Sequence, residues 1–199
     1  MEALWPGQSP GPLGNRLSVL LSTVRGVLDP GKRRDQDHFV GADKNAVWLD
    51  EANLSVDVEA FLRTAEEALR LHRAGESDAV TRLTAAEAVY AGDFLEEDAY
   101  EDWALAMREE ARATYVAVAR ALADTAAARG DVDATTRYSL RVLERDPYDE
   151  PAHLGLVAAL ERAGRHGEAR RRFRAYCARM DEIGVESAPF PAPQSRPEL

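Results

Sequence analysis

A pattern of glycine, alanine and a larger apolar residue recurs three times in this chain and constrains the fold more than any other feature. With the spacing Gly-x3-Ala-x3-apolar, the first two sets are Gly75, Ala79, Leu83 and Gly130, Ala134, Tyr138. The third set, with one extra residue after its glycine, is Gly164, Ala169, Phe173. The last two glycines are 34 residues apart. This period is typical of a unit made of two antiparallel helices and their turns.

The repeat predicts a mainly α protein with stacked, tetratricopeptide-like helical hairpins over residues 51–186. The small alanine lets the paired helices approach closely, and the larger residue fills the space between hairpins. Pro147 ends one helix, because proline cannot continue it. In the long helix expected from about residue 103, apolar residues recur every three or four positions. We interpret them as core: Trp103, Met107, Ala111, Tyr115, Val118, Leu122 and Ala126.

The first 50 residues have a different pattern. After a loop rich in proline and glycine, residues 13–28 place their apolar side chains on one face of a predicted helix, which Asp29-Pro30-Gly31 ends. Residues 38–42 and 46–49 then predict a short β-hairpin. The proline-rich composition of residues 187–199 favours a disordered tail there. The sequence therefore predicts two domains, over residues 1–50 and 51–186, followed by this tail.

Charge is distributed unevenly along the 199 residues. The formal net charge is −10, yet residues 13–34 carry five positive charges against Asp29 alone. A polyanion would be attracted to this stretch and repelled elsewhere, although five solvated surface cations are the simpler interpretation. Cys177 is the single cysteine, so no disulfide is expected. The sequence has neither a secretory signal nor a long apolar run, and we expect a cytoplasmic protein that does not contact a membrane.

No residue pattern predicts an enzyme, a metal site or a cofactor. An acidic cluster lacks the alternating oxygen ligands and turn glycine of a calcium loop, so we interpret it as solvated surface: Asp93, Glu96, Glu97, Asp98, Glu101 and Asp102. The four histidines have no i, i+4 pairing for zinc. The chain also lacks a Gly-x-Ser-x-Gly elbow and a glycine-rich phosphate loop.

Several segments, taken in order, resemble the Streptomyces antibiotic regulatory protein (SARP) family and its bacterial transcriptional activator domain. They are ALWP at 3–6, NRLSVLLSTVR at 15–25, VWLD at 47–50, VDVEAFL at 56–62, GDFLE at 92–96, RHGEA at 165–169, Tyr176 and GVE at 184–186. The resemblance covers nearly the whole chain. It implies a winged-helix DNA-binding domain, with residues 13–28 as recognition helix and 37–49 as wing, followed by a tetratricopeptide-like activator domain.

This resemblance implies a DNA-binding transcriptional regulator, an activator, whose helical repeats contact RNA polymerase or another protein. Its expected partner is double-stranded DNA with repeated promoter sites, bound by more than one copy, so a homodimer is also expected. The residues expected to face the major groove are Asn15, Arg16, Ser18, Val19, Ser22, Thr23 and Arg25. Those expected to contact phosphates are Lys32, Arg33, Arg34 and Lys44.

The chain departs from the family pattern at its beginning. Family members carry a further strand set and two helices before the point that matches Met1, so we expect a truncated winged helix. Without that support, Leu17, Leu20, Leu21 and Val24 have no obvious surface on which to pack. The alternative function is a helical-repeat scaffold that binds protein and not DNA, using the concave surface of its stacked hairpins.

Overall fold

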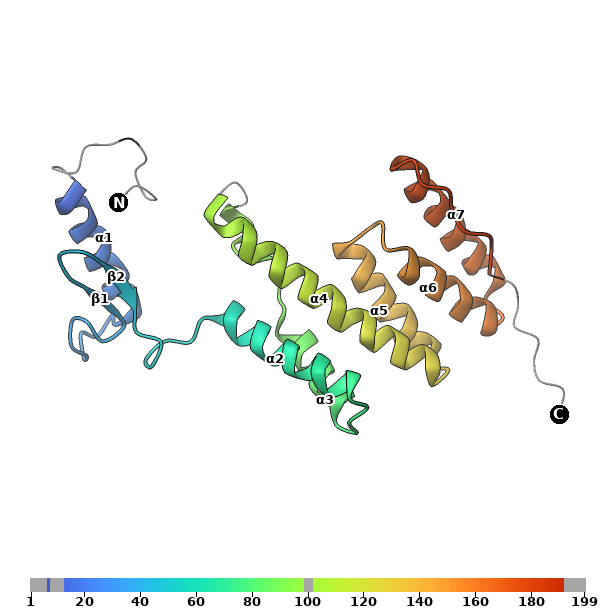
Figure 1. Cartoon of the computed structure of the whole chain (residues 1–199), viewed down its shortest axis with the longest axis horizontal. Coiled ribbons are helices and arrows are strands. Elements are labelled where there is room, and N and C mark those ends of the chain that lie inside the picture. Colours follow the sequence, from blue (N-terminus) through green and yellow to red (C-terminus); the bar gives the residue numbers. More distant parts are fainter. Residues whose placement is uncertain (1–6, 8–12, 99–101, 192–199) are drawn as a thin grey trace. The chain divides into compact units, whose positions relative to one another are not determined.

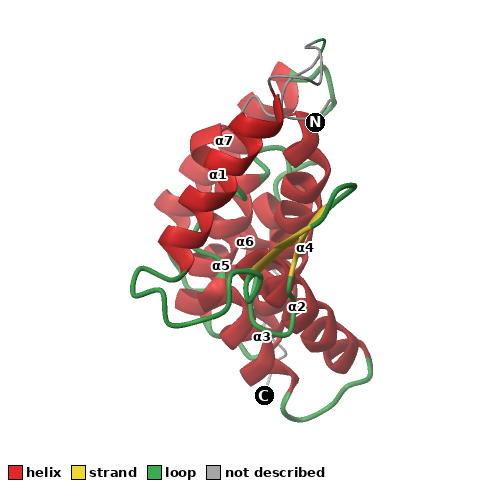
Figure 2. Ribbon diagram, turned by 90° about the vertical axis from the view of Figure 1, so that its left-hand side faces the viewer, coloured by secondary structure: helices red, strands yellow, loops and turns green. Residues whose placement is uncertain are grey.

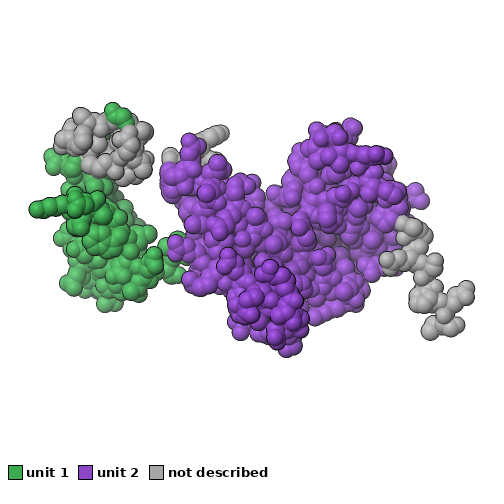
Figure 3. Space-filling model, viewed as in Figure 1, with its two compact units in different colours: residues 1–56 green, residues 57–199 purple. Residues whose placement is uncertain are grey.

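A computed structural model describes Gly7 and residues 13–98 and 102–191 of the chain. Contacts divide it into two compact units, residues 1–56 and residues 57–199, which Figure 3 colours separately. The predicted fold class is confirmed, since the described residues form helical hairpins preceded by one helix and a two-stranded hairpin. The predicted boundary at residue 50 and the boundary between the units are six residues apart.

Unit 1, over residues 1–56, contains helix α1 (Leu13–Leu28) and strands β1 (Val40–Ala42) and β2 (Val47–Leu49). The antiparallel strands, yellow in Figure 2, pair Val40 with Leu49 and Ala42 with Val47. Asp43 sets the turn between them, because its carboxylate accepts hydrogen bonds from the backbone N–H groups of residues 45 and 46. These bonds lower the pKa of Asp43. The Asp43 N–H also donates a 2.9 Å hydrogen bond to the Ala46 carbonyl oxygen, so side-chain and backbone bonds of the same residue fix this turn.

Gly41 and Trp48 face each other across the hairpin, and the indole ring lies over the glycine. A Cβ at position 41 would come within 2.3 Å of the Trp48 ring. We expect Gly41→Ala to destabilise unit 1 by about 1–3 kcal/mol, the usual range for overpacking. Loss of near-ultraviolet circular dichroism from Trp48 during urea unfolding measures the effect.

The control for this substitution is Gly26→Ala in α1. A Cβ there meets nothing within 4 Å, and alanine favours helix over glycine by about 1 kcal/mol. We therefore expect Gly26→Ala to be neutral or stabilising. Equal destabilisation by both substitutions would contradict the packing of Trp48 on Gly41.

The described residues of unit 2 form a stack of three helical hairpins (Figure 1). Its helices are α2 (Asp57–Arg73), α3 (Ala79–Val89), α4 (Asp102–Ala128), α5 (Val132–Arg145), α6 (Glu150–Arg162) and α7 (His166–Glu182), with the 3-10 turn η1 (Glu96–Asp98) before α4. Helices α2 and α3, α4 and α5, and α6 and α7 pack as pairs, and neighbouring pairs pack on each other.

The repeated residues occupy equivalent positions in the three hairpins. Gly75, Gly130 and Gly164 have φ near +70°, the left-handed conformation that ends a helix and that glycine adopts without strain. Each leads into the second helix of a pair, where Ala79 and Ala169 are buried. The repeat read from the sequence is thus the physical unit of the fold.

The stripe of apolar residues in α4 is core except at its first two positions. The five predicted residues from Ala111 to Ala126 are buried, but Met107 is half-buried and the side chain of Trp103 is 64% exposed. The prediction for Trp103 was wrong because periodicity identifies a face and not what covers it. In the first turn of α4, Ala104 is fully buried, so the covered face of the helix there lies beside Trp103 and does not include it.

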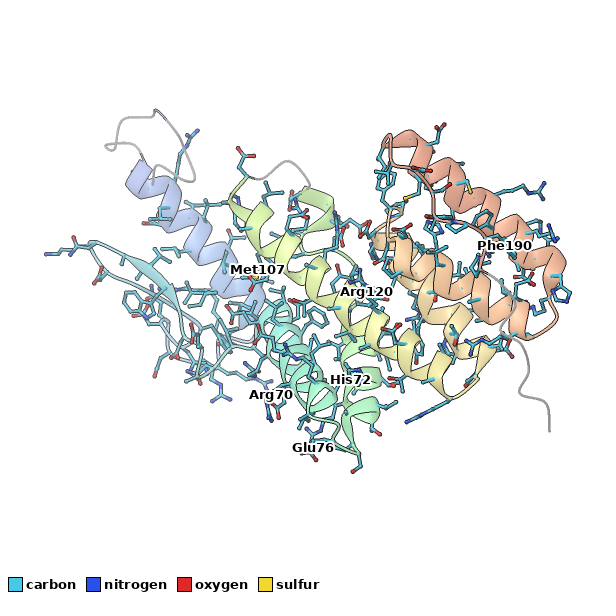
Figure 4. All side chains as sticks on the ribbon, turned by 45° about the vertical axis from the view of Figure 1, so that its right-hand side comes forward. Arg70, His72, Glu76, Met107, Arg120 and Phe190 are labelled. Atoms are coloured by element: carbon cyan, nitrogen blue, oxygen red, sulfur yellow. The ribbon has the colours of Figure 1, made fainter. Side chains whose placement is uncertain are left out.

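The segment after α7 also differs from expectation. The sequence favours disorder from residue 187, yet residues 187–191 pack on unit 2. The Ala188 N–H donates a 2.7 Å hydrogen bond to the Tyr176 hydroxyl oxygen. Phe190, labelled beside α7 in Figure 4, packs edge-on against Phe173 with 5.0 Å between ring centroids. One aromatic side chain therefore outweighs the proline-rich composition around it, while residues 192–199 lie outside the described residues.

Candidate nucleic-acid interface

The polar face of α1 presents a row of exposed side chains. Of the residues predicted to face the major groove, the exposed ones are Asn15, Arg16, Ser18, Val19, Ser22 and Thr23. The Ser18 and Thr23 hydroxyls each donate a 3.0 Å hydrogen bond to the carbonyl four residues earlier, so their oxygens can still accept one. Val19 is 66% exposed and offers an apolar contact of the kind that a thymine methyl group makes.

Arg25 has a different position from the rest of this predicted group. Its guanidinium donates hydrogen bonds of 2.8 and 3.1 Å to the Val40 carbonyl oxygen and forms an ion pair with Asp37. The side chain is only 17% exposed. Arg25 therefore joins α1 to β1, a role that its place at the edge of the polar face did not indicate.

The predicted phosphate contacts fall into two groups within unit 1. Lys32, Arg33 and Arg34 are all exposed in the turn directly after α1. Asp29 shapes this turn, because its carboxylate accepts a 2.8 Å hydrogen bond from the Arg34 N–H. Hydrogen bonds from the backbone of residues 33 and 34 lower the pKa of Asp29. Lys44 is exposed separately, at the turn of the β-hairpin.

An apolar surface of unit 1 also stays exposed. On α1 the exposed apolar residues include Leu20, Val24 and Val27, whereas Leu17 and Leu21 are half-buried. All three residues of β2 are exposed as well. The described residues of unit 1 therefore bury only part of the leucine face of α1, as the sequence predicted for Leu20 and Val24.

Sequence reasoning missed a group of polar side chains between the first two hairpins of unit 2. Asp93 was predicted to be solvated, but its side chain is 12% exposed and contacts Arg112, Arg145 and the Tyr90 hydroxyl. Burial raises the pKa of Asp93, but hydrogen bonds from Arg112 and Tyr90 and the two positive charges outweigh this effect and lower the pKa. Burial, reinforced by the adjacent Asp93 carboxylate, raises the pKa of Tyr90.

Arg108 has a comparable structural role in the segment before α4. This buried side chain donates hydrogen bonds to the carbonyl oxygens of Phe94, Leu95 and Asp98, at 2.9, 3.2 and 3.1 Å. The acidic side chains of η1 stay exposed, as predicted for Glu96, Glu97 and Asp98, while Glu101 lies outside the described residues. A spacing of four between Arg108 and Arg112 was the only signal in the sequence that both could face this segment.

In the described part of the chain, no three potential metal ligands lie close enough together to hold an ion. The described helices also include none with the length and apolar character needed to cross a membrane.

Together, these features define a helical-repeat protein with a helix-and-hairpin unit at its N-terminal end. Residues 56–190 match the model of the bacterial transcriptional activator domain, and the chain belongs to this family. The family is one of transcriptional regulators and not a class of enzymes. The predicted resemblance to SARP regulators is confirmed by this match and by a structural likeness.

That likeness is to Mycobacterium tuberculosis EmbR, solved in complex with a low affinity phosphopeptide. The TM-score is 0.67 and the sequence identity 22%, over 95% of this chain and 50% of the EmbR chain. The present chain thus spans about half the length of the structure it matches. A comparison with curated proteins found no match.

Proposed function

We propose that this protein is a DNA-binding transcriptional activator that acts in the cytoplasm. Helix α1 reads base edges in the major groove, and unit 2 contacts RNA polymerase or another protein. The observation that carries the proposal is the exposed polar face of α1, from Asn15 to Thr23, in a chain of the bacterial transcriptional activator family. Exposed amide, hydroxyl and guanidinium groups on one helix face are the groups that recognise bases.

The side chains of unit 1 have different roles in this proposal. Asn15, Arg16, Ser18, Val19, Ser22 and Thr23 supply the contacts that depend on base sequence. Lys32, Arg33, Arg34 and Lys44 supply phosphate contacts, which add affinity without sequence preference. Arg25 is a positioning residue in this proposal, because its guanidinium is occupied by the Val40 carbonyl and Asp37. It sets the angle at which α1 and the hairpin meet DNA.

Two substitutions separate these roles. We expect Arg16→Ala to weaken binding to a preferred sequence by about 1–3 kcal/mol while random DNA is affected less. We expect Lys32→Ala to weaken both equally and to reduce the slope of log K against log salt by about 1. Fluorescence anisotropy with selected and random duplexes measures both effects. Equal losses on both duplexes in both variants would contradict the placement of α1 in the major groove.

The experiment that tests the proposal itself is selection of duplexes from a genomic pool by the full chain, with random DNA as competitor, across a salt series. Sequence-selective binding with a steep salt dependence is the expected result, because phosphate contacts release condensed counterions. A folded chain that binds no duplex at low salt would contradict it.

The apolar surface of unit 1 favours a second candidate, a scaffold that binds protein and not DNA. Leu20, Val24 and Val27 are exposed next to each other on α1, and contiguous apolar surface of this kind is typical of contact sites. A homodimer in which the two copies bury this surface against each other would remove these apolar side chains from water. Sedimentation velocity with and without duplex DNA distinguishes the two candidates, since the scaffold predicts a dimer that binds no duplex, whereas the activator binds duplex.

A further inference from the structure

The last hairpin of unit 2 is strongly basic, although the chain as a whole is acidic. Residues 162–174 contain six arginines and one glutamate, a balance of +5 in a chain with a net charge of −10. The arginines are Arg162, Arg165, Arg170, Arg171, Arg172 and Arg174. This charge lies in α7, in the turn before it and on the last residue of α6, at the end of the stack farthest along the chain (Figure 1).

Three of these arginines form an exposed group, which we call the α7 arginine patch: Arg170, Arg171 and Arg174. At 100° and 1.5 Å per residue, they occupy an arc of about 100° and about 6 Å of the helix axis. Within the described residues, Arg171 and Arg174 have no ion-pair partner. Arg165 and Arg179 differ, since they pair with Glu168 and Glu182.

The fold keeps this patch turned away from the core. Ala169, Tyr176 and Met180 bury the opposite side of α7. Arg170 lies over the ring of Phe190, with 5.6 Å between its guanidinium carbon and the ring centroid, which restricts the side chain while leaving its charge unneutralised. The patch is therefore an open cationic surface on a rigid helix.

We propose that the α7 arginine patch binds phosphates of double-stranded DNA, as a second contact outside unit 1. This inference rests on the proposed DNA-binding function. Guanidinium groups suit it because they bind phosphate oxygens through two parallel hydrogen bonds and remain charged at any physiological pH. Charge within a Debye length of about 8 Å dominates such contacts, so the negative charge elsewhere on unit 2 does not cancel the patch.

The composition of the exposed side of α7 favours DNA over a protein partner. Arginine is common in protein interfaces too, but there it accompanies aromatic side chains in a well-packed, desolvated centre. Among the described residues, no large hydrophobic side chain of α7 is exposed, and the patch is bordered by Gly167, Ala175 and Ala178. A surface of arginines and small residues can approach a phosphate backbone closely, but it offers a protein little apolar area.

The test uses the full chain with Arg171→Gln and Arg174→Gln combined. Fluorescence anisotropy with a labelled random-sequence duplex, across a salt series, gives the slope of log K against log salt. We expect the slope to become less steep by about 1.8, because each lost phosphate contact contributes about 0.9. The matched control combines Arg63→Gln and Arg73→Gln, two exposed positions on α2 that change the net charge equally. The control should keep the wild-type slope.

Each of the other outcomes would contradict the proposal that the α7 arginine patch binds DNA. An unchanged slope in the α7 variant shows that the arginines do not contact DNA, and an equal change in the control shows an effect of net charge alone. Altered sedimentation of the α7 variant with unchanged DNA binding would assign the patch to a contact with a second copy of the chain. If Arg16→Ala abolishes sequence preference while the α7 variant keeps the wild-type slope, only the patch fails. No duplex binding by the wild type would remove both proposals.

Discussion

Replacing Asp149 by alanine is expected to lower the free energy of unfolding by about 2–4 kcal/mol. The Asp149 side chain is fully buried and has two roles at the start of α6. Its carboxylate accepts a 2.8 Å hydrogen bond from the Ala152 N–H, and it forms an ion pair with Arg120. A lost N-cap costs about 1 kcal/mol. The ion pair adds less than a fully buried one would, because Arg120 is 44% exposed and can be hydrated after the substitution.

Asp131 provides the matched control for this prediction. It caps α5 in the same way, with a 2.9 Å hydrogen bond from the Ala134 N–H, but it is exposed and has no ion-pair partner among the described residues. We expect Asp131→Ala to cost about 1 kcal/mol. Urea unfolding followed by far-ultraviolet circular dichroism measures both variants. Equal losses would show that the Arg120 ion pair does not stabilise the second and third hairpins.

Asp93→Asn is expected to destabilise unit 2 by about 3 kcal/mol. Asparagine retains an oxygen that can accept the Tyr90 hydroxyl hydrogen bond, which is 2.6 Å long in the native protein. It removes the charge opposite Arg112 and Arg145, whose side chains are 35% and 28% exposed. Breaking one partner of a buried ion pair usually costs more than the pair contributes, because the remaining charges lose their compensation. Urea unfolding at neutral pH measures the loss.

The loss in unfolding free energy caused by Asp93→Asn should depend on pH, and this dependence provides an independent check. The folded-state pKa of Asp93 is lowered, so its ion pairs contribute fully above the unfolded pKa of about 3.9. That contribution disappears as the pH falls from this value through the lower folded pKa. The difference in unfolding free energy between wild type and Asp93→Asn should therefore be constant near neutral pH and shrink below about pH 4. A difference that stays constant in acid would contradict the ion pairs.

Local patterns in the sequence predicted much of the fold. The apolar period from residue 13 to 28 corresponds to α1, and the recurring glycines mark the left-handed ends of three helices because only the neighbouring residues decide those features. Contacts distant in sequence were not predictable in this way. Asp93 pairs with Arg112, 19 residues away, and Arg25 with the carbonyl of Val40, 15 residues away. Their positions are set by tertiary packing, which one sequence does not reveal.

The same distinction applies to the candidate interface. The exposed positions on α1 followed from helical periodicity, since residues opposite a leucine stripe face away from what the stripe contacts. The occupied guanidinium of Arg25 did not follow, because an arginine at the edge of a polar face can turn toward either side. Trp103 gives the converse case, an apolar residue at a core position in the pattern whose side chain is mostly exposed.

Phe190 changes where the third repeat ends. A boundary drawn at the last helical residue, Glu182, would separate Phe190 from the apolar cluster of Leu156, Leu160 and Phe173 that it packs against. The family match also continues to residue 190. An irregular segment, and not a helix, thus packs on the third hairpin after α7. Sequence comparisons that count only helical positions would therefore miss this aromatic residue, although it covers part of the apolar cluster of the third hairpin.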